Sequence, residues 1–262
     1  MAFTIDFGFE TPGAPFERAS LALFFASSCG PGELGRVPGA AAVADGSRYV
    51  ELFEAQVGLS PLDIGAYAEV VGGADPALGA ALRADEAIAR GVFPIIAADD
   101  RRATAGSCRG PLVALWGTVG RTETDEAAIF EDRTSILAGV RAASARAFKA
   151  IPGSVAIIPA RGLLERHDAF RTAMACIEGK VHLSIDLDVL APAVAQAPRS
   201  VEPGGLSWYE LMDAVEMVFE GPGVAAADLV GLAGVAPRSP AALLGAQILL
   251  KLAGLVAARS GR

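Results

Sequence analysis

Two aspartates, Asp186 and Asp188, stand one residue apart at the end of an apolar run at 181–187. Alternate residues of a strand share one face, so both carboxylates are expected to point the same way. Burying two like charges is costly unless a cation neutralises them. That cation is either a hard metal ion bound through oxygen or a basic side chain. In the competing interpretation, the strand simply reaches solvent and both carboxylates are hydrated.

Other polar side chains follow neighbouring apolar runs. Asp99, Asp100 and Arg101 come shortly after the run at 92–96, and Arg121 comes after the run at 112–116. In parallel α/β sheets the chemistry gathers at the carboxyl ends of the strands. These residues are therefore candidates for the same edge as the two aspartates.

Short β-rich runs alternate with Ala-rich helical patterns along the chain, a rhythm typical of a parallel sheet covered by helices. The sequence thus predicts a three-layer α-β-α domain of the α/β class, with a mostly parallel sheet and helices on both faces, as a single domain over residues 1–262. The expected strands are 21–25, 62–64, 92–96, 112–116, 154–158, 181–187 and 229–235. The expected helices lie near 38–55, 76–90, 125–149, 162–178, 207–220 and 239–257.

The segment HLSIDLDVLAP at 182–192, followed by VEPGGLSWYEL at 201–211, resembles the carboxyl-terminal signature of the ureohydrolases, the arginase, agmatinase and formimidoylglutamase family. That signature is Ser-x-Asp-x-Asp-x-x-Asp-Pro, then a loop ending in Pro-Gly-Gly-Leu. Upstream, LDIGAY, GVFPIIAADD and LVALW resemble further family segments in the same order. The resemblance implies an arginase-like fold. The matching residues are Ser184, Asp186, Asp188, Pro192, Pro203, Gly204, Gly205, Leu206 and Glu210.

By this resemblance, Asp186 and Asp188 take the positions of two metal-binding aspartates, while most other ligand positions have changed. The family's first histidine ligand falls on Asp100, and its Asp-Ala-His-x-Asp ligands fall on Gly117, Val119 and Arg121. The glutamate that binds the substrate guanidinium falls on Gly234, and the entrance loop has become 197–201. No histidine lies between residues 1 and 166 to restore the set.

A dinuclear hydrolase site holds two ions about 3.5–4 Å apart and needs several anionic and imidazole ligands. We therefore expect no cofactor; the alternative is one weakly bound Mn²⁺ or other divalent cation on Asp100, Asp186 and Asp188. If the alignment holds, Arg121 replaces the metal charge, since its guanidinium pairs well with carboxylates. Arg101 or Arg199 is expected to supplement it.

The histidines and cysteines are weaker candidates for metal binding or catalysis. His182 is expected to be a satisfied core residue and His167 a surface residue of a helix. Cys29, Cys108 and Cys176 are odd in number and widely spaced, the pattern of reduced thiols in a cytoplasmic protein. A nucleophilic role for Cys108 lacks a histidine beside it in sequence.

The formal net charge of -8 argues against nucleic acid or an anionic membrane as a partner. The N-terminus carries no signal-peptide pattern, and the apolar stretch at 241–257 is expected to pack on the sheet. The sequence favours a ureohydrolase-fold protein that is catalytically silent or repurposed, either for ligand binding or as a partner subunit. The alternative is a C–N hydrolase of linear guanidino or amidino compounds with a reorganised metal site. The resemblance implies an oligomer, of identical chains or with an intact ureohydrolase.

Overall fold

The computed structural model describes residues 2–6, 13–51, 58, 65–120, 125–165, 167–198 and 201–260. The chain forms two compact units, one of residues 1–99 with 232–262 and the other of residues 100–231. The single domain over residues 1–262 stays a prediction. Asp186, Asp188 and Arg101 all belong to the second unit.

The first unit has a sheet built around β2, whose six residues LALFFA are all buried. β2 runs parallel to its neighbours β3 and β4, while β1 is antiparallel to β3. A strand buried on both faces explains why this run is continuously apolar. The strands in spatial order are β1 (Ala2–Thr4), β3 (Ala66–Val71), β2 (Leu21–Ala26) and β4 (Phe93–Ala97).

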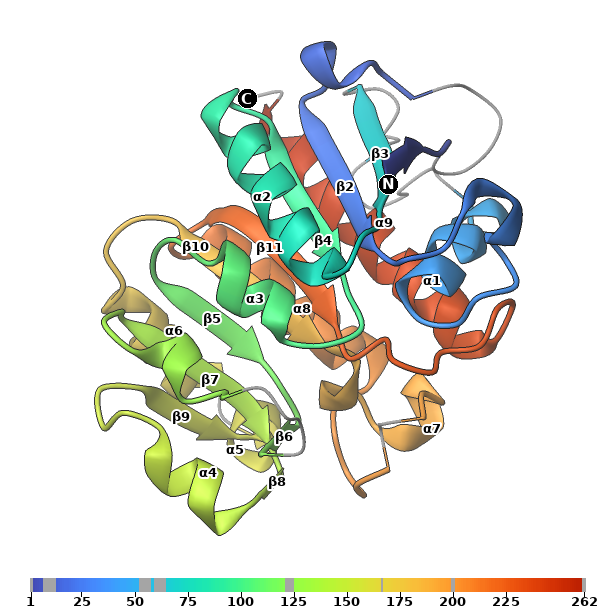
Figure 1. The fold of residues 1–262 in the computed structure, drawn as a ribbon. Helices are drawn as coiled ribbons and strands as arrows, with labels where there is room; N and C mark the ends of the chain where they lie inside the picture. The colour runs from blue at the N-terminus through green and yellow to red at the C-terminus, as the bar shows by residue number, and fades with distance from the viewer. Residues whose placement is uncertain are drawn as a thin grey trace. The chain divides into compact units, whose positions relative to one another are not determined.

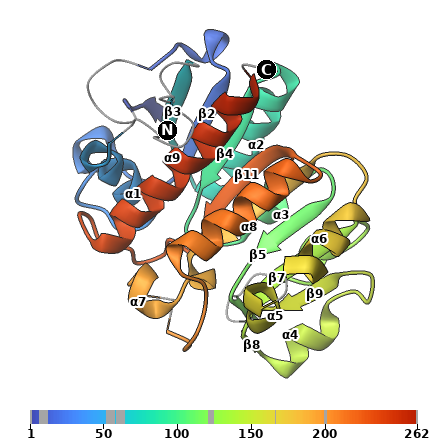
Figure 2. The same ribbon diagram turned by 180° about the vertical axis from the view of Figure 1, so that it is seen from behind.

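Helices cover both faces of this sheet. α2 (Pro76–Ala89) lies on the face seen in Figure 1, and α9 (Pro240–Ser260) lies on the face seen in Figure 2. α1 (Ala40–Gly46) packs on α9 so closely that a Cβ at Gly46 would lie 2.9 Å from the Ala242 carbonyl oxygen. α9 is long and apolar enough to cross a membrane, but 78% of its most apolar window is buried within the structure. This burial agrees with the packing on the sheet expected for 241–257.

The second unit has a sheet of parallel strands that carries the candidate site. α3 (Arg102–Ser107) lies on the face seen in Figure 1, and α8 (Trp208–Glu220) lies on the opposite face seen in Figure 2. α8 begins with a capping box between Ser207 and Glu210. The strands in spatial order are β11 (Val224–Val230), β10 (Val181–Asp186), β5 (Leu112–Leu115), β7 (Ser135–Val140) and β9 (Ala156–Pro159).

Shorter elements complete both units. A separate small parallel pair joins β6 and β8. These elements are β6 (Thr118–Val119), β8 (Ala142–Ala143), α4 (Ala145–Ala150), α5 (Ala160–Glu165), α6 (His167–Ala175) and α7 (Pro192–Ala195), with 3-10 turns at Phe16–Arg18, Pro31–Glu33, Ser47–Tyr49, Ala128–Phe130 and Leu187–Val189.

Some predicted elements are wrong in kind or position. The helix expected at 125–149 is instead strand β7, strand β8 and the short helix α4. The helix expected at 38–55 is only α1 and a 3-10 turn in its described part, and β3 and α3 were not predicted. The strand expected at 229–235 is β11, which begins and ends five residues earlier. The chain after β11 forms a turn, in which Gly231 and Gly234 both have positive φ. The strand expected at 62–64 lies outside the described residues.

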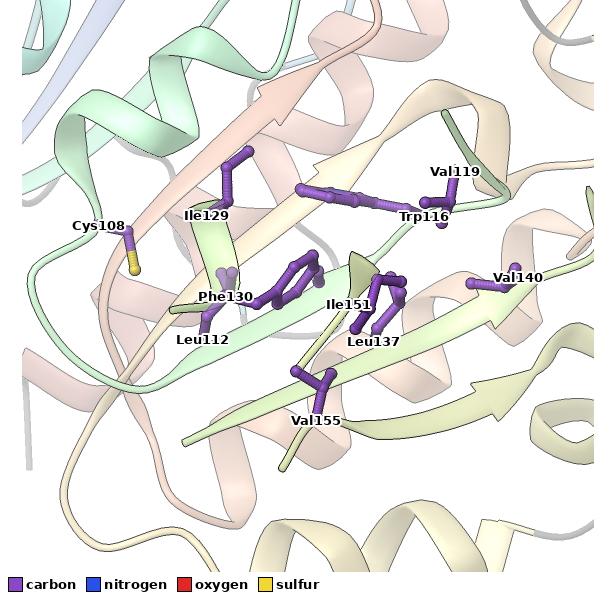
Figure 3. Close-up of a cluster of buried hydrophobic side chains, with 11 residues drawn as sticks. Cys108, Leu112, Trp116, Val119, Ile129, Phe130, Leu137, Val140, Ile151 and Val155 are labelled. Atoms are coloured by element: carbon purple, nitrogen blue, oxygen red, sulfur yellow. The ribbon is translucent and has the colours of Figure 1, made fainter. Parts of the chain in front are cut away.

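An apolar cluster fills the space beside β5 and β7 (Figure 3). At its centre Trp116 meets Phe130 edge to face, with ring centroids 5.4 Å apart. Val119, which the resemblance places at a metal-ligand position, belongs to this cluster and is fully buried. The apolar packing therefore fixes Trp116, which in turn lines the candidate site.

Candidate functional site

The aspartate pair lies at the end of β10, where the strand turns into a 3-10 segment. The Asp186 carboxylate accepts a hydrogen bond of 2.9 Å from the Asp188 amide and so caps this turn. Both residues are only 5% exposed. The interpretation of two hydrated carboxylates is therefore wrong, and their charge must be balanced inside the protein.

The balancing cation is Arg101, the residue before α3. Its Nε lies 2.9 Å from Oδ2 of Asp186, and its Nη2 lies 3.2 Å from Oδ2 of Asp188. The Arg101 side chain is 1% exposed. One planar cation thus bridges the two aspartates with separate N–H groups, as a guanidinium is well suited to do.

A third carboxylate and an aromatic ring complete the surroundings of Arg101. Its Nη1 donates to Oε1 of Glu126 at 2.7 Å and to the Thr118 carbonyl at 2.9 Å. Its Cζ lies 4.1 Å from the centroid of the Trp116 ring, in the range of a cation–π contact. The guanidinium is therefore bound at its edge by oxygen and on its face by indole.

Every oxygen of the aspartate pair accepts a hydrogen bond from the protein. The Gly117 amide donates to Oδ1 of Asp188 at 2.8 Å, and the Thr118 hydroxyl donates to Oδ2. Oδ1 of Asp186 accepts a hydrogen bond from the Asp188 amide, and Oδ2 accepts one from Nε of Arg101. Protein donors thus already occupy all four carboxylate oxygens, and the described residues contain no group of three or more His, Cys, Asp or Glu able to hold a metal ion. The residues present do not fit the divalent cations that the resemblance implies.

Burial and the neighbouring charges shift the pKa values of Asp186 and Arg101. Burial, reinforced by the charge of Asp188, raises the pKa of Asp186 to about 6, although Arg101 acts in the opposite direction. Burial alone would lower the pKa of Arg101, but Asp186, Asp188 and Glu126 together raise it. Arg101 therefore stays charged, and the site carries more carboxylates than cations.

A second buried polar network follows the same face of β10. The Ser184 hydroxyl donates to Oδ1 of Asp228 at 2.6 Å, and His182 Nε2 lies 2.6 Å from Oδ2 of the same carboxylate. Trp116 Nε1 donates to the Ser184 hydroxyl at 3.0 Å, and Thr104 of α3 lies 3.1 Å from it. His182 is a buried core residue, as predicted, but its Nδ1 has no hydrogen-bond partner.

The other residues proposed from the sequence have separate surroundings. The Asp100 carboxylate pairs with its neighbour Arg102, on the solvent side of α3. Asp99, in the first unit, accepts from the Ala40 amide at 2.9 Å and so holds the start of α1. Arg121 and Arg199 lie outside the described residues. Arg101, which the sequence offered as a supplement to Arg121, makes such contacts with the two aspartates, and the expectation for Arg121 itself stays a prediction.

The resemblance places a metal-ligand position at Gly117, and the surrounding atoms leave no room for a side chain there. A Cβ there would collide with the Asp188 carbonyl oxygen and with Nη1 of Arg141. Arg141 in turn donates to the carbonyls of Val189, Leu190 and Glu202 and so holds the loop after the aspartates. The Asp188 carbonyl and the Arg141 guanidinium thus fill the space that a side chain at position 117 would need.

Cys108 is 2% exposed at the end of α3, and burial raises the pKa of its thiol. A buried thiol with a raised pKa is a poor nucleophile. The geometry therefore gives no support to a thiol-based mechanism.

Glu126 and Asp228 take part in the two networks but were missed by sequence reasoning. Glu126 lies in a segment predicted to be helical and next to Asp125, where one more carboxylate carries no signal. Asp228 is the one charged residue of the otherwise apolar strand VAAADLV. Because the strand was expected at 229–235, Asp228 fell outside it and was not recognised as a buried charge.

Comparison with known proteins identifies the family and relatives of the chain. Residues 113–254 match the arginase family. Over 90 residues the chain is 32% identical to N(1)-aminopropylagmatine ureohydrolase of Thermococcus kodakarensis, covering 34% of this chain and 31% of that protein. The match thus spans less than a third of that relative.

Solved structures resemble the chain over nearly its full length. Agmatine ureohydrolase of Thermoplasma volcanium has a TM-score of 0.72 at 16% identity, covering 97% of each chain. Trypanosoma cruzi formiminoglutamase, in a structure with Mn²⁺, has a TM-score of 0.71 at 14% identity, covering 94% of each chain. These likenesses confirm the predicted fold class, a three-layer α/β fold of the arginase type with a mostly parallel sheet.

Proposed function

Because the chain belongs to the arginase family, we propose that it is a ureohydrolase-fold protein in which an internal ion network replaces the metal site. In this proposal the protein does not hydrolyse guanidino compounds. Its fold serves ligand binding or assembly with other subunits.

One observation carries this proposal: the Arg101 guanidinium bridges Asp186 and Asp188. A dication and a guanidinium cannot share this position, because their charges repel and the carboxylate oxygens already accept hydrogen bonds. Removing one partner of a buried ion network is strongly destabilising, so Arg101 is not easily displaced. The metal-activated hydroxide of a dinuclear hydrolase has no place to form.

A urea-release assay tests the proposal. Purified protein is incubated with Mn²⁺ and with arginine or agmatine, beside an active arginase as a positive control. We expect no urea above the rate without protein. Saturable urea production that is lost in an Asp188→Asn variant would refute the proposal and favour the alternative, a hydrolase with a reorganised metal site.

We further propose that the chain is oligomeric, either with itself or with an intact ureohydrolase. A fold retained over 97% of the chain beside a changed site supports a role in assembly. Light scattering at micromolar concentration should give a mass above that of one 26.7 kDa chain. A monomer that also fails to co-purify with a co-expressed intact ureohydrolase would contradict this part of the proposal.

A further inference from the structure

The surroundings of Arg101 match the shape of a guanidinium and not merely its charge. Oxygens of Asp186, Asp188, Glu126 and Thr118 accept four N–H···O bonds along the edge of one plane. The Trp116 ring covers the face of that plane at 4.1 Å. An ammonium has three donors in a tetrahedral arrangement and cannot satisfy four acceptors spread around a plane.

Groups other than Arg101 hold this set in place. The Asp188 carboxylate accepts hydrogen bonds from the Gly117 amide and the Thr118 hydroxyl. The Glu126 carboxylate accepts a hydrogen bond of 2.6 Å from the Gly120 amide. Trp116 is fixed by its bond to the Ser184 hydroxyl and by Phe130. The acceptors and the ring are therefore expected to keep their arrangement when the Arg101 side chain is absent.

We propose that Asp186, Asp188, Glu126, the Thr118 carbonyl and the Trp116 ring form a guanidinium-binding site that Arg101 occupies in cis. A free alkylguanidinium binds there once the Arg101 side chain is removed. The intact chain blocks its own site, so guanidino compounds do not bind at this position in the wild-type protein. The inference rests on the same cation replacement as the proposed function but not on the absence of catalysis.

The substitution Arg101→Ala defines the probe. The atoms deleted beyond Cβ are two carbons and the guanidinium, which together make up N-ethylguanidinium. Ligand that binds only the folded state raises the midpoint of thermal unfolding. At about 100 times Kd, the Tm of Arg101→Ala should rise by roughly 5–10 °C for a chain of this size.

Four controls make the result specific. Wild-type protein and the Arg102→Ala variant, which loses a neighbouring exposed arginine, should show no shift with N-ethylguanidinium. Ethylammonium should bind Arg101→Ala about tenfold more weakly or worse, because it leaves charge-assisted hydrogen bonds unmade. Arg101→Ala combined with Glu126→Gln should lose most of the response.

The outcomes separate this inference from the proposed function. If Arg101→Ala does not fold alone, it should refold by dilution into millimolar N-ethylguanidinium and not into ethylammonium. Refolding or stabilisation by neither ligand, or by both equally, would overturn the inference. Stabilisation by Mn²⁺ in preference to N-ethylguanidinium would also overturn it. None of these results depends on urea release by the wild-type protein.

Discussion

The Gly117 amide donates a 2.8 Å hydrogen bond to Oδ1 of Asp188. The Asp188 carbonyl oxygen lies so close to Gly117 that a Cβ there would be 2.1 Å from it. A side chain at Gly117 would have to displace both that carbonyl and the Arg141 guanidinium. If the resemblance places a metal ligand here correctly, the glycine at this position goes together with close packing of the backbone around it. Restoring the ligand by a single substitution would not restore the site.

Gly117→Ala should destabilise the protein by at least about 1–3 kcal/mol, because the added methyl group overpacks a buried site. Gly153→Ala is the matched control, since a Cβ there meets nothing within 4 Å. The control should change the free energy of unfolding by no more than about 0.5 kcal/mol. Urea denaturation of the three proteins gives the comparison, and equal stabilities of both variants would contradict the packing described.

A double-mutant cycle measures the contact between Arg101 and Asp186. Arg101→Met alone should cost about 3–5 kcal/mol, because it leaves buried carboxylates without their cation. Adding Asp186→Asn should restore part of this loss, so the double variant is less damaged than the sum of the single changes. The coupling free energy should be about 0.5–3 kcal/mol.

The exposed pair of Arg102 and Asp100 is the control cycle, since the Arg102 side chain is 55% exposed and that of Asp100 is 25% exposed. Its coupling should not exceed about 1 kcal/mol. Equal coupling in the two cycles would show that burial adds nothing at Arg101.

The raised pKa of Asp186 predicts an unusual pH dependence. The pKa is raised to about 6 in the folded protein from an ordinary value of 3.8, chiefly by burial. Between these values the folded state binds more protons than the unfolded state, so this carboxyl makes stability fall as pH rises. Its destabilising contribution is complete above about pH 6 and absent below about pH 4.

The test compares wild-type and Asp186→Asn proteins, because other carboxylates contribute to the total pH dependence. The stability of the wild type minus that of the variant should decrease between pH about 4 and about 6, then level off. A difference that is constant, or that increases with pH, would mean that Asp186 is ionised at least as readily in the folded chain as in the unfolded one.

The thiols should react in the order of their exposure. Cys176 is exposed, whereas Cys29 and Cys108 are buried and have raised pKa values because of burial. In the native protein, an aromatic disulfide reagent should modify Cys176 quickly, and all three thiols only after denaturation. Cys176→Ser should abolish the fast reaction. Rapid modification of Cys108 in that variant would reopen a thiol-based mechanism.

The fold could be predicted because buried parallel strands leave a strong pattern. Continuous apolar runs such as LALFF identified β2, and helical periodicity identified α2, α8 and α9 close to their observed bounds. The segment at 125–149 failed because its alanines imitate a helix while Ser135–Val140 pairs with β5 as strand β7. There the neighbouring strands override local propensity.

Of the site, only the two aspartates of the sequence motif could be predicted. Asp186 and Asp188 were found because two carboxylates end one apolar strand, but the choice of cation required the fold. Arg101 and Arg121 both follow predicted strands, and spacing alone could not show that the Arg101 guanidinium pairs with the aspartates. Glu126 could not be found, since its contact with Arg101 depends on a loop without a sequence pattern.

The central claim is that Arg101 takes the place of the metal ions, and metal analysis tests it most directly. Wild-type protein is equilibrated with excess Mn²⁺, passed through a desalting column and analysed for metal per chain, with an active arginase treated in parallel. We expect the wild-type protein to retain no stoichiometric metal while the arginase keeps its own. Two equivalents of tightly held Mn²⁺ per wild-type chain, lost in an Asp186→Asn variant, would contradict it.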